Sequence, residues 1–364
     1  MRIVQTSHHY YPHTGGTERV VKILVDGLAE LKNEVHIFSD SVDLKRLSDQ
    51  DHVIAHGISL RRIGKFRFPE RDYWKQIDNT RSDVVHVQGQ RVWSSDYLYR
   101  KLHRMGAKKV FTAHGFYQLT FGGKSNHIYY YRFMPSFLSK FHKIISLTEY
   151  EANITRSLAP RCSDRITVIP DPVDMGLMDS LMSKENSKLP ENLVPGEFVL
   201  HSGGLQRNKN IEDIIESIVG RKTKLVLTGN LPDAAYWKFL LDLSNKKGVH
   251  MVHLGNVDDQ VLYDLMANCS HYISASKFES FGMSMIEAAY MGASVIAYEA
   301  GVAGELSKMG VLKVAKGPQD IGRAMDSFKR SDNHDETRTN LKERYDSKKV
   351  VKRINDLYED MLNE

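Results

Sequence analysis

Short runs rich in Val and Ile recur along this chain, and stretches with helical spacing of apolar residues lie between them. Strands that are continuously apolar are buried on both faces, as in parallel sheets whose crossover connections are helices. The alternation therefore predicts an α/β protein. The first series of predicted strands comprises Ile3 to Thr6, Val35 to Phe38, Leu60 to Ile63, Val84 to Val87, Val110 to Thr112, Ile144 to Leu147 and Ile166 to Ile169. The helix predicted after the first strand has an apolar side made of Val20, Val21, Leu24, Leu28 and Leu31.

The alternation begins again in the second half of the chain. The strands predicted there are Phe198 to Ser202, Leu225 to Thr228, Met251 to Leu254, Tyr272 to Ser274 and Val295 to Ala297. Two prolines between Ile169 and Asp174, and the polar stretch through Pro195, interrupt both patterns, so we interpret this segment as an interdomain linker. A length of 364 residues is about twice that of a usual domain. We predict two Rossmann-like domains, residues 1–170 and 171–345, with a final helix over 346–364 that packs back on the first.

The cysteine content and the start of the chain bear on the compartment. Cys162 and Cys269 are the only cysteines, and they lack the spacing of metal ligands. This pattern argues against a disulfide framework and favours a reducing compartment. The sequence starts with a strand-like segment, Met1 to Ser7, and no apolar run approaches the ~18 residues of a spanning helix. We expect a cytoplasmic protein that is soluble or peripheral on the inner face of the membrane.

Charge is distributed unevenly along the chain. Residues 1–170 contain 26 Lys and Arg against 16 Asp and Glu, whereas residues 171–364 contain 24 against 29. The basic half suits an anionic partner such as a phospholipid surface, although a solvated surface explains the asymmetry equally well. Nucleic acid is not an expected partner, because no recognition motif accompanies the charge. The aromatic residues interleaved with the basic ones include Trp74, Trp93, Phe133, Phe137 and Phe141.

Two glycine pairs join predicted strands to predicted helices, where backbone N–H groups and the helix dipole favour a bound phosphate. These are Gly15-Gly16 and Gly203-Gly204, and the second is followed by Arg207 and Lys209. Two cations there can neutralise a diphosphate leaving group without a metal. Neither loop reads Gly-x-Gly-x-x-Gly, which disfavours a dinucleotide oxidoreductase. A plain turn with Thr17 as helix cap would explain the first pair as well.

Three further side chains are candidates for the site. His114 stands at the C-terminal end of a predicted strand, where open α/β sheets bind ligands. Glu279 and Glu287 are eight residues apart, a rise of ~12 Å in a helix, so they suit two parts of one extended ligand better than a tight catalytic pair. A capping box of Ser284 with Glu287 is an alternative for the second glutamate. It leaves Glu279 unexplained.

Taken in order, these segments resemble the large retaining GT-B glycosyltransferase family that contains sucrose synthases and bacterial phosphatidylinositol mannosyltransferases. The resemblance covers nearly the whole chain and rests on the Pro12 to Glu18 loop, Asp83-Val-Val-His86, Thr112-Ala-His-Gly115, Val168 to Asp174, the Lys209 loop, and Glu279 with Glu287. It implies a GT-B fold, in which two Rossmann-like domains face each other across a cleft. It also implies transfer of a sugar from a UDP- or GDP-sugar without metal or cofactor.

The resemblance further implies a role for individual residues. Those that would contact the donor are the backbone of Gly16 at the phosphate, His114 and Glu279 at the sugar, Lys209 at the diphosphate, Glu287 at the ribose, and the backbone around Phe281, Gly282 and Met283. The acceptor, a glycan, a glycolipid or a small molecule, would lie on the side of the first domain. The implied mechanism is front-face displacement with retention of configuration.

This chain departs from the family pattern at three positions. Gly204 stands where the family has the arginine of Gly-Arg-Leu, so Arg207 would have to replace that arginine. Asp171 and Asn210 stand where asparagine and glycine are usual. Two alternatives therefore stay open. One is a nucleotide-sugar-binding protein with weak or lost turnover, and the other is an inverting transferase with His8, His9 or His13 as general base.

Overall fold

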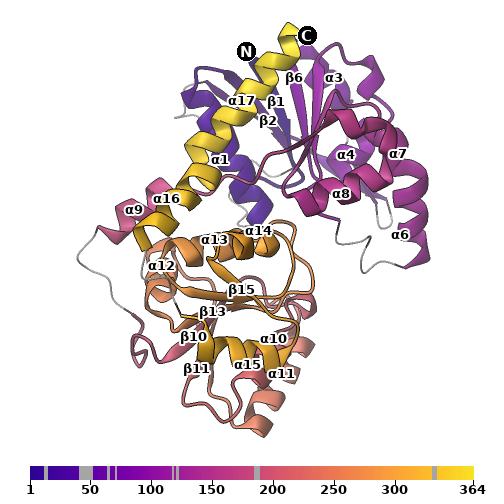
Figure 1. The fold of residues 1–364 in the computed structure, drawn as a ribbon. Helices are drawn as coiled ribbons and strands as arrows, with labels where there is room; N and C mark the ends of the chain where they lie inside the picture. The colour runs from indigo at the N-terminus through magenta and orange to yellow at the C-terminus, as the bar shows by residue number, and fades with distance from the viewer. Residues whose placement is uncertain are drawn as a thin grey trace. The chain divides into compact units, whose positions relative to one another are not determined.

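The computed structural model of the protein describes residues 1–11, 15–40, 52–63, 66–69, 72–116, 119, 123–183, 189–329 and 334–364. The chain forms two compact units, Met1–Pro172 together with Ser347–Glu364, and Val173–Asp346 (Figure 1). Each unit has a parallel sheet covered by helices, which confirms the predicted α/β architecture. Pro12 and His13 lie outside the described residues.

The sheet of the first unit has seven parallel strands in the order β3-β2-β1-β6-β7-β8-β9. These strands are β1 (Arg2–Thr6), β2 (Glu34–Ser39), β3 (Val53–Gly57), β6 (Val84–Gln88), β7 (Lys108–Thr112), β8 (Lys143–Ser146) and β9 (Ile166–Val168). The predicted strand from Leu60 to Ile63 exists as β4, but it pairs antiparallel with β5 (Phe66–Pro69) outside this sheet. Its place in the sheet is taken by β3, which sequence analysis did not find because its residues are not continuously apolar and only Val53 is buried.

The helices of the first unit include one that returns from the end of the chain. They are α1 (Gly16–Glu30), α3 (Tyr73–Asn79), α4 (Trp93–Leu98), α6 (Lys124–Ile128), α7 (Met134–Leu138), α8 (Glu149–Leu158) and α17 (Ser347–Asn363), with shorter turns η1 (Leu102–Arg104), η2 (Tyr129–Phe133) and η3 (Pro160–Arg165). Helix α17, yellow in Figure 1, packs along α1 so closely that a Cβ on Gly27 would lie 2.9 Å from a Val351 methyl group. The predicted return of the last helix is confirmed.

Helix α1 buries the predicted apolar side, except that Leu31 lies just past its end and is exposed. Three of the aromatic residues that are interleaved with basic ones in the sequence lie in the core. Trp93, Phe137 and Phe141 are buried in one cluster of this unit. Phe133, on the π-helical turn η2, is half exposed.

The sheet of the second unit has six parallel strands in the order β12-β11-β10-β13-β14-β15. These strands are β10 (Phe198–Ser202), β11 (Lys224–Thr228), β12 (Met251–His253), β13 (His271–Ser274), β14 (Ser294–Ala297) and β15 (Leu312–Val314). All except the short β15 were predicted. Strand order reverses between β10 and β13, and open α/β sheets bind ligands at the C-terminal ends of strands beside such a reversal.

Eight helices accompany this sheet among the described residues. They are α9 (Met175–Met182), α10 (Ile211–Ser217), α11 (Ala234–Lys247), α12 (Asp259–Asn268), α13 (Met283–Tyr290), α14 (Ala303–Lys308), α15 (Pro318–Ser327) and α16 (His334–Tyr345), with one 3₁₀ turn, η4 (Arg207–Lys209). Part of the segment interpreted as a linker is helix α9. Asp174 caps it by accepting the Leu177 N–H at 2.9 Å, and Met175 and Met178 are buried.

Candidate functional site

The loops that follow β10 and β13 meet at the point where the strand order of the second unit reverses. The Lys277 N–H donates to the Asn208 carbonyl at 2.9 Å, which ties the two loops together. Beside this bond, Lys209 Nζ lies 2.6 Å from Glu279 Oε1, and each of the two side chains is less than one fifth exposed. Two residues that the sequence placed 70 positions apart thus form one shielded ion pair.

Buried polar side chains lie beneath this ion pair. Burial, with a smaller contribution from the charge of Lys209, lowers the pKa of His201 to about 4, so the ring is neutral. Its Nδ1–H donates to the Ile273 carbonyl at 2.9 Å. Burial raises the pKa of Tyr272 above its usual range, with smaller contributions from the charges of Glu279 and Glu287. Both glutamates therefore act on the same phenol, whose hydroxyl donates from β13 to the Ser202 carbonyl at the end of β10, at 3.2 Å.

The glycines in these loops are required by close backbone approaches. Gly203 has φ +143°, and its carbonyl oxygen lies where a Cβ on Gly229 would come within 2.1 Å. Gly229 itself has φ +116°, so no other residue fits there without rearrangement. At Gly204 a Cβ would approach Asn230 Oδ1 to 2.7 Å, so the arginine usual in the family would require Asn230 to move. Sequence analysis found Gly203 and Gly204 but not Gly229.

Asn210 and Arg207 lie in the same loop as Lys209 but have different surroundings. Asn210 has φ +53°, a left-handed conformation that asparagine tolerates better than most residues, which explains how it replaces the usual glycine. Arg207 is two-thirds exposed and points toward α11, where its guanidinium group lies 3.5 Å from Asp233 and over the ring of Tyr236. In this position Arg207 faces α11, whereas Lys209 faces Glu279.

Helix α13 begins two residues earlier than the capping-box alternative requires. Gly282, with φ +98°, is the N-cap, and Ser284 already lies in the first turn. The Ser284–Glu287 capping box is therefore wrong. Glu287 is 4% exposed, on the buried side of the helix. The helix begins with the N–H groups of Met283 and Ser284. Phe281 precedes them, and its carbonyl accepts the Val302 N–H at 2.7 Å.

In the first unit, the predicted phosphate loop ends on a helix start without a side-chain cap. Gly15 is the N-cap of α1 and Gly16 its first residue, so Thr17 does not cap the helix. The side chain of Glu18 folds back over Gly15, where a Cβ would come within 2.1 Å of its carboxylate. A phosphate bound at these N–H groups would have to displace that carboxylate.

His114 follows β7 in a strained backbone conformation. Its φ is +55°, which is uncommon for a side chain other than glycine, asparagine or aspartate. The ring is 7% exposed; Nε2 lies 2.8 Å from Gln88 Oε1, and Nδ1 lies 3.8 Å from Asp171. Burial lowers the pKa of His114 to about 4, so the imidazole is neutral at physiological pH. A neutral ring can exchange hydrogen bonds with a sugar hydroxyl but offers no positive charge.

A buried carboxylate holds the loop that carries His114. Glu151 accepts the Gly115 N–H at 2.8 Å and the Leu147 N–H at 2.6 Å, which joins the ends of β7 and β8. Burial raises the pKa of Glu151 to about 7 against the opposing effect of these two bonds. Burial, and then the charge of Glu151, raise the pKa of Asp171 well above its usual range. The sequence motifs gave no signal for Glu151 or Gln88.

This carboxylate pair makes stability depend on pH. A carboxyl group whose pKa is higher in the folded than in the unfolded chain stabilises the fold at low pH, and this stabilisation is lost as pH rises through the folded pKa, here about 7 for Glu151. Asp171→Asn restores the residue usual in the family and cannot ionise. We expect the free energy of unfolding of this variant to rise relative to wild type as pH increases from 5 to 8. The rise is about 1.4 kcal/mol for each pH unit that lies between the unfolded-state and the folded-state pKa of Asp171. Urea unfolding across this range measures it, and a difference that stays constant with pH would contradict the expectation.

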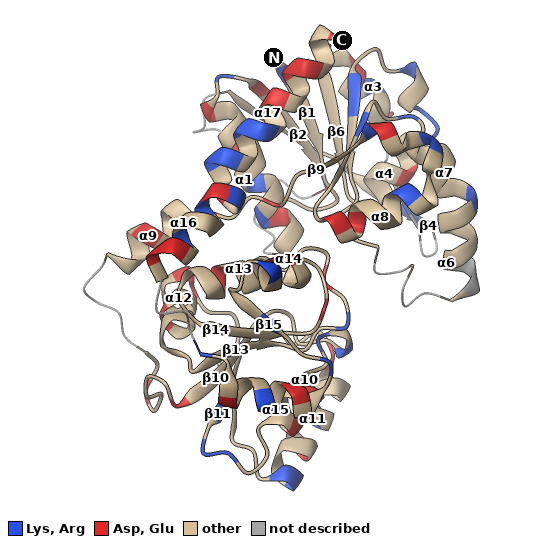
Figure 2. Ribbon diagram, in the orientation of Figure 1, with Lys and Arg blue, Asp and Glu red and all other residues tan. Residues whose placement is uncertain are grey.

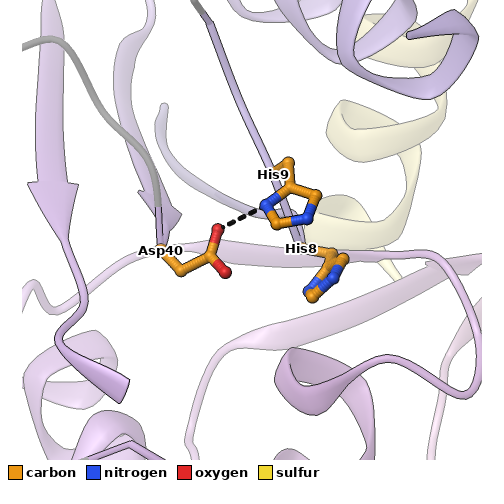
Figure 3. Close-up of side chains that lie close together, drawn as sticks. All are labelled: His8, His9 and Asp40. Carbon is orange, nitrogen blue, oxygen red and sulfur yellow. Dashed lines mark hydrogen bonds and ion pairs between the residues drawn. The ribbon is translucent and has the colours of Figure 1, made fainter. Parts of the chain in front are cut away.

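A second cluster of titratable side chains lies after β1 and β2. His8, His9 and Asp40 place one possible ligand atom each within 4.8 Å of one another, and His9 Nδ1 lies 2.7 Å from Asp40 Oδ1 (Figure 3). The other carboxylate oxygen of Asp40 lies 3.6 Å from Arg67. A neighbouring guanidinium disfavours a metal ion, so the arrangement favours a His–Asp pair.

Two family models match nearly the whole chain. The model described as Glycosyltransferase Family 4 matches residues 14–177, and the model described as Glycosyl transferases group 1 matches residues 183–359. The chain is a family 4-like glycosyltransferase with the GT-B fold. The boundary between the two matches falls in the segment where the two series of strands are separated.

Known proteins similar to this glycosyltransferase cover most or all of its length. An uncharacterized glycosyltransferase of Methanocaldococcus jannaschii is 23% identical over 86% of this chain and 84% of its own. A glycosyltransferase from Rickettsia africae has a TM-score of 0.77 at 19% identity over 99% of this chain and 98% of its own. HepE of Anabaena, solved with UDP and glucose, has a TM-score of 0.76 at 18% identity over 99% and 100%. Sucrose-phosphate synthase from Thermosynechococcus elongatus has a TM-score of 0.77 at 16% identity over 100% and 99%. These structures share the fold.

Among the described helices, none combines the length and the apolar character needed to cross a membrane. The two cysteines are unpaired and buried in separate units. Of the predicted site residues, the second unit brings together Lys209, Glu279 and the glycine loops. The first unit holds Gly15, Gly16 and His114.

Proposed function

We propose that this glycosyltransferase moves a sugar from a nucleotide-diphosphate donor, UDP- or GDP-linked, to a hydroxyl acceptor, with retention of configuration. The observation that carries the proposal is the shielded Lys209–Glu279 pair between glycine-lined loops at the strand-order reversal of the second unit. A cation and a hydroxyl-binding carboxylate side by side suit the diphosphate and the sugar of one donor. Anabaena HepE, which has the same fold, was solved with UDP-glucose.

The chemistry requires charge stabilisation more than acid–base catalysis. The bond between the sugar C1 and the phosphate oxygen breaks, and the acceptor oxygen bonds to C1 on the same face while its proton passes to the departing diphosphate. Lys209 would stabilise the charge that grows on the diphosphate, and Glu279 would orient the sugar hydroxyls. The helix start at Met283 would offer N–H groups to the phosphates, and Glu287 would bind the ribose. His114, neutral, would contact the donor sugar.

Nucleotide release and stereochemistry test this proposal. The protein is incubated with UDP-, GDP- and ADP-sugars, and release of free nucleoside diphosphate is measured. An α-linked donor should give an α-linked product, which the anomeric proton signals in NMR report. A protein that binds these donors without releasing nucleoside diphosphate with any acceptor tried would instead be a binding protein.

An inverting reaction is a second candidate because of one specific observation. His9 and Asp40 form a 2.7 Å pair in the first unit, and a carboxylate that orients an imidazole is the arrangement of a general base. In that case His9 would take the acceptor proton, and an α-linked donor would give a β-linked product. The same NMR experiment separates the two outcomes.

The acceptor, or the membrane that carries it, is proposed to be anionic. Residues 97–148 contain nine Lys and Arg and no Asp or Glu. Within this stretch α6 and η2 expose three large apolar side chains, Ile128, Tyr131 and Phe133, each at least half exposed. Figure 2 shows no acidic residue on the ribbon from α6 to α7. Exposed rings beside cations favour the headgroup layer of an anionic bilayer.

Sedimentation with liposomes checks this surface. We expect binding to vesicles that contain anionic phospholipid, weakening from low to high salt, and no binding to neutral vesicles. Replacing Ile128, Tyr131 and Phe133 together by serine should reduce binding at least about tenfold, because each loses apolar area that enters the bilayer. A matched control is the triple serine variant of Leu231, Phe239 and Leu241, exposed apolar residues of the second unit. Absence of binding to both vesicle types would point to a soluble acceptor.

A further inference from the structure

A chain of buried polar side chains runs from the C-terminal helix to His114. It starts at Tyr358 on α17, passes through Gln5 on β1 and Gln88 at the end of β6, and ends at the His114 ring. His86 on β6 joins it as a branch between Tyr358 and Thr112. Tyr358, Gln5, Gln88 and His86 are at most 2% exposed. The branch links the Asp83-Val-Val-His86 motif to the Thr112-Ala-His-Gly115 motif.

Sheet geometry brings these side chains together. His86 and Gln88 are two residues apart on one strand and so point to the same face. Gln5 is the register partner of His86 in the adjacent β1, and Thr112 is that of Gln88 in β7. The C-terminal helix covers this face and places the Tyr358 ring edge-on to the His86 ring, with centroids 5.9 Å apart.

The orientation of the Gln88 amide in the structure gives each hydrogen bond of this chain a direction. Burial lowers the pKa of His86 to about 3, so its ring is neutral and one nitrogen must accept. In the structure the Gln88 amide NH₂ lies 3.3 Å from Nδ1, so Nδ1 is the nitrogen that accepts, and it also accepts from the Tyr358 hydroxyl at 2.6 Å. Tyr358 therefore donates to His86 and accepts from the Gln5 NH₂ at 3.1 Å.

The orientations of both glutamine amides agree with these directions. Since the Gln5 NH₂ faces Tyr358, its Oε1 is turned to the Gln88 NH₂, which donates to it at 3.0 Å. Gln88 then has only its own Oε1 for His114, at 2.8 Å. An amide oxygen can only accept, so His114 must carry its proton on Nε2. Its Nδ1 keeps the lone pair.

We propose that Tyr358 is a positioning residue for His114, because its hydroxyl sets the orientation of Gln5 and Gln88 and thereby the tautomer of the His114 ring. The inference rests on the proposed role of His114 in sugar transfer. A flipped Gln88 amide would present its NH₂ to the ring and reverse the tautomer, so that Nδ1 would donate and Nε2 would accept. Removal of the Tyr358 hydroxyl takes away the group that favours one orientation of the Gln5 amide over the other.

The test uses Tyr358→Phe, which keeps the ring and removes only the hydroxyl. The tautomer of His114 is read from long-range ¹H–¹⁵N NMR spectra of histidine-labelled protein, with the signal assigned from His114→Asn. In wild type we expect a protonated Nε2 and an unprotonated Nδ1. In Tyr358→Phe we expect the two ¹⁵N shifts to move toward each other, turnover to fall about tenfold, and the KM for the donor to stay constant, as for a misoriented catalytic contact.

Two further variants keep the inference testable if Tyr358→Phe is poorly folded. Gln5→Met interrupts the relay at its middle with a side chain of similar volume, and it should shift the His114 signals in the same way. Tyr10→Phe is the matched control, because Tyr10 is buried in the same core as Tyr358 but its hydroxyl has no hydrogen-bond partner within the described residues. Unchanged His114 shifts in both relay variants would overturn the inference.

These outcomes are independent of the proposed function. The NMR comparison needs no substrate, so absence of nucleotide release by the wild-type protein would contradict the proposed function and leave the positional result intact. Shifted tautomers together with unchanged turnover would show that the His114 tautomer does not matter for transfer, and would equally overturn the role assigned to Tyr358.

Discussion

Replacing Lys209 by alanine is expected to lower turnover on the order of 10² to 10³-fold, as loss of one preorganised charge at a developing anion usually does. The ammonium group is fixed by Glu279 at 2.6 Å and is mostly shielded from water, so its charge acts on the leaving diphosphate through a medium less polar than bulk water. Steady-state kinetics with the best donor measures the effect. The loss should appear in turnover more than in the KM for the donor.

The matched control for this variant is Lys247→Ala. Lys247 also forms an ion pair in the second unit, 2.9 Å from Glu216, but it lies at the end of α11, away from the loops after β10 and β13. We expect its removal to leave turnover unchanged and to alter stability by less than about 1 kcal/mol. Equal kinetic effects of the two variants would mean that Lys209 acts on folding and not on the reaction.

The architecture was predictable because the strands of a parallel sheet are recognisable in the sequence as short apolar runs. Strands buried on both faces are apolar throughout, and every predicted strand of the second series exists with ends shifted by a residue at most. The pattern failed where burial is partial. β3 was not found because only Val53 in it is buried, and Leu60 to Ile63 was predicted in the parallel series but forms the hairpin strand β4.

The candidate site was predictable in its composition but not in its connections. Glycine pairs and the Lys209 loop carry local signals, because their backbone conformations restrict which residues fit. The partner of a side chain has no such signal. Gln88 and Glu151 hold His114 through contacts between strands and loops that are distant in sequence, and the orientation of Arg207 toward Asp233 depends on where α11 lies.

Glu279→Gln is expected to separate binding of the diphosphate from transfer of the sugar. In the present structure the Glu279 carboxylate neutralises Lys209, so a diphosphate must compete with it for the ammonium group. The neutral amide has the same size but removes that competition. We expect the affinity for free nucleoside diphosphate to rise about fivefold, the equivalent of about 1 kcal/mol for a partly shielded ion pair.

Transfer should change in the opposite direction, because the amide is a weaker acceptor for the sugar hydroxyls in the transition state. We expect turnover to fall on the order of 10²-fold while the nucleoside diphosphate binds more tightly. Calorimetric titration with UDP or GDP, beside kinetics with the matching sugar donor, measures both quantities on one preparation. Arg207→Ala is the comparison, since its loss should weaken diphosphate binding if Arg207 replaces the missing arginine and should change nothing if it only pairs with Asp233. Weaker diphosphate binding in Glu279→Gln would contradict the competition and would mean that the carboxylate orients Lys209 for the donor.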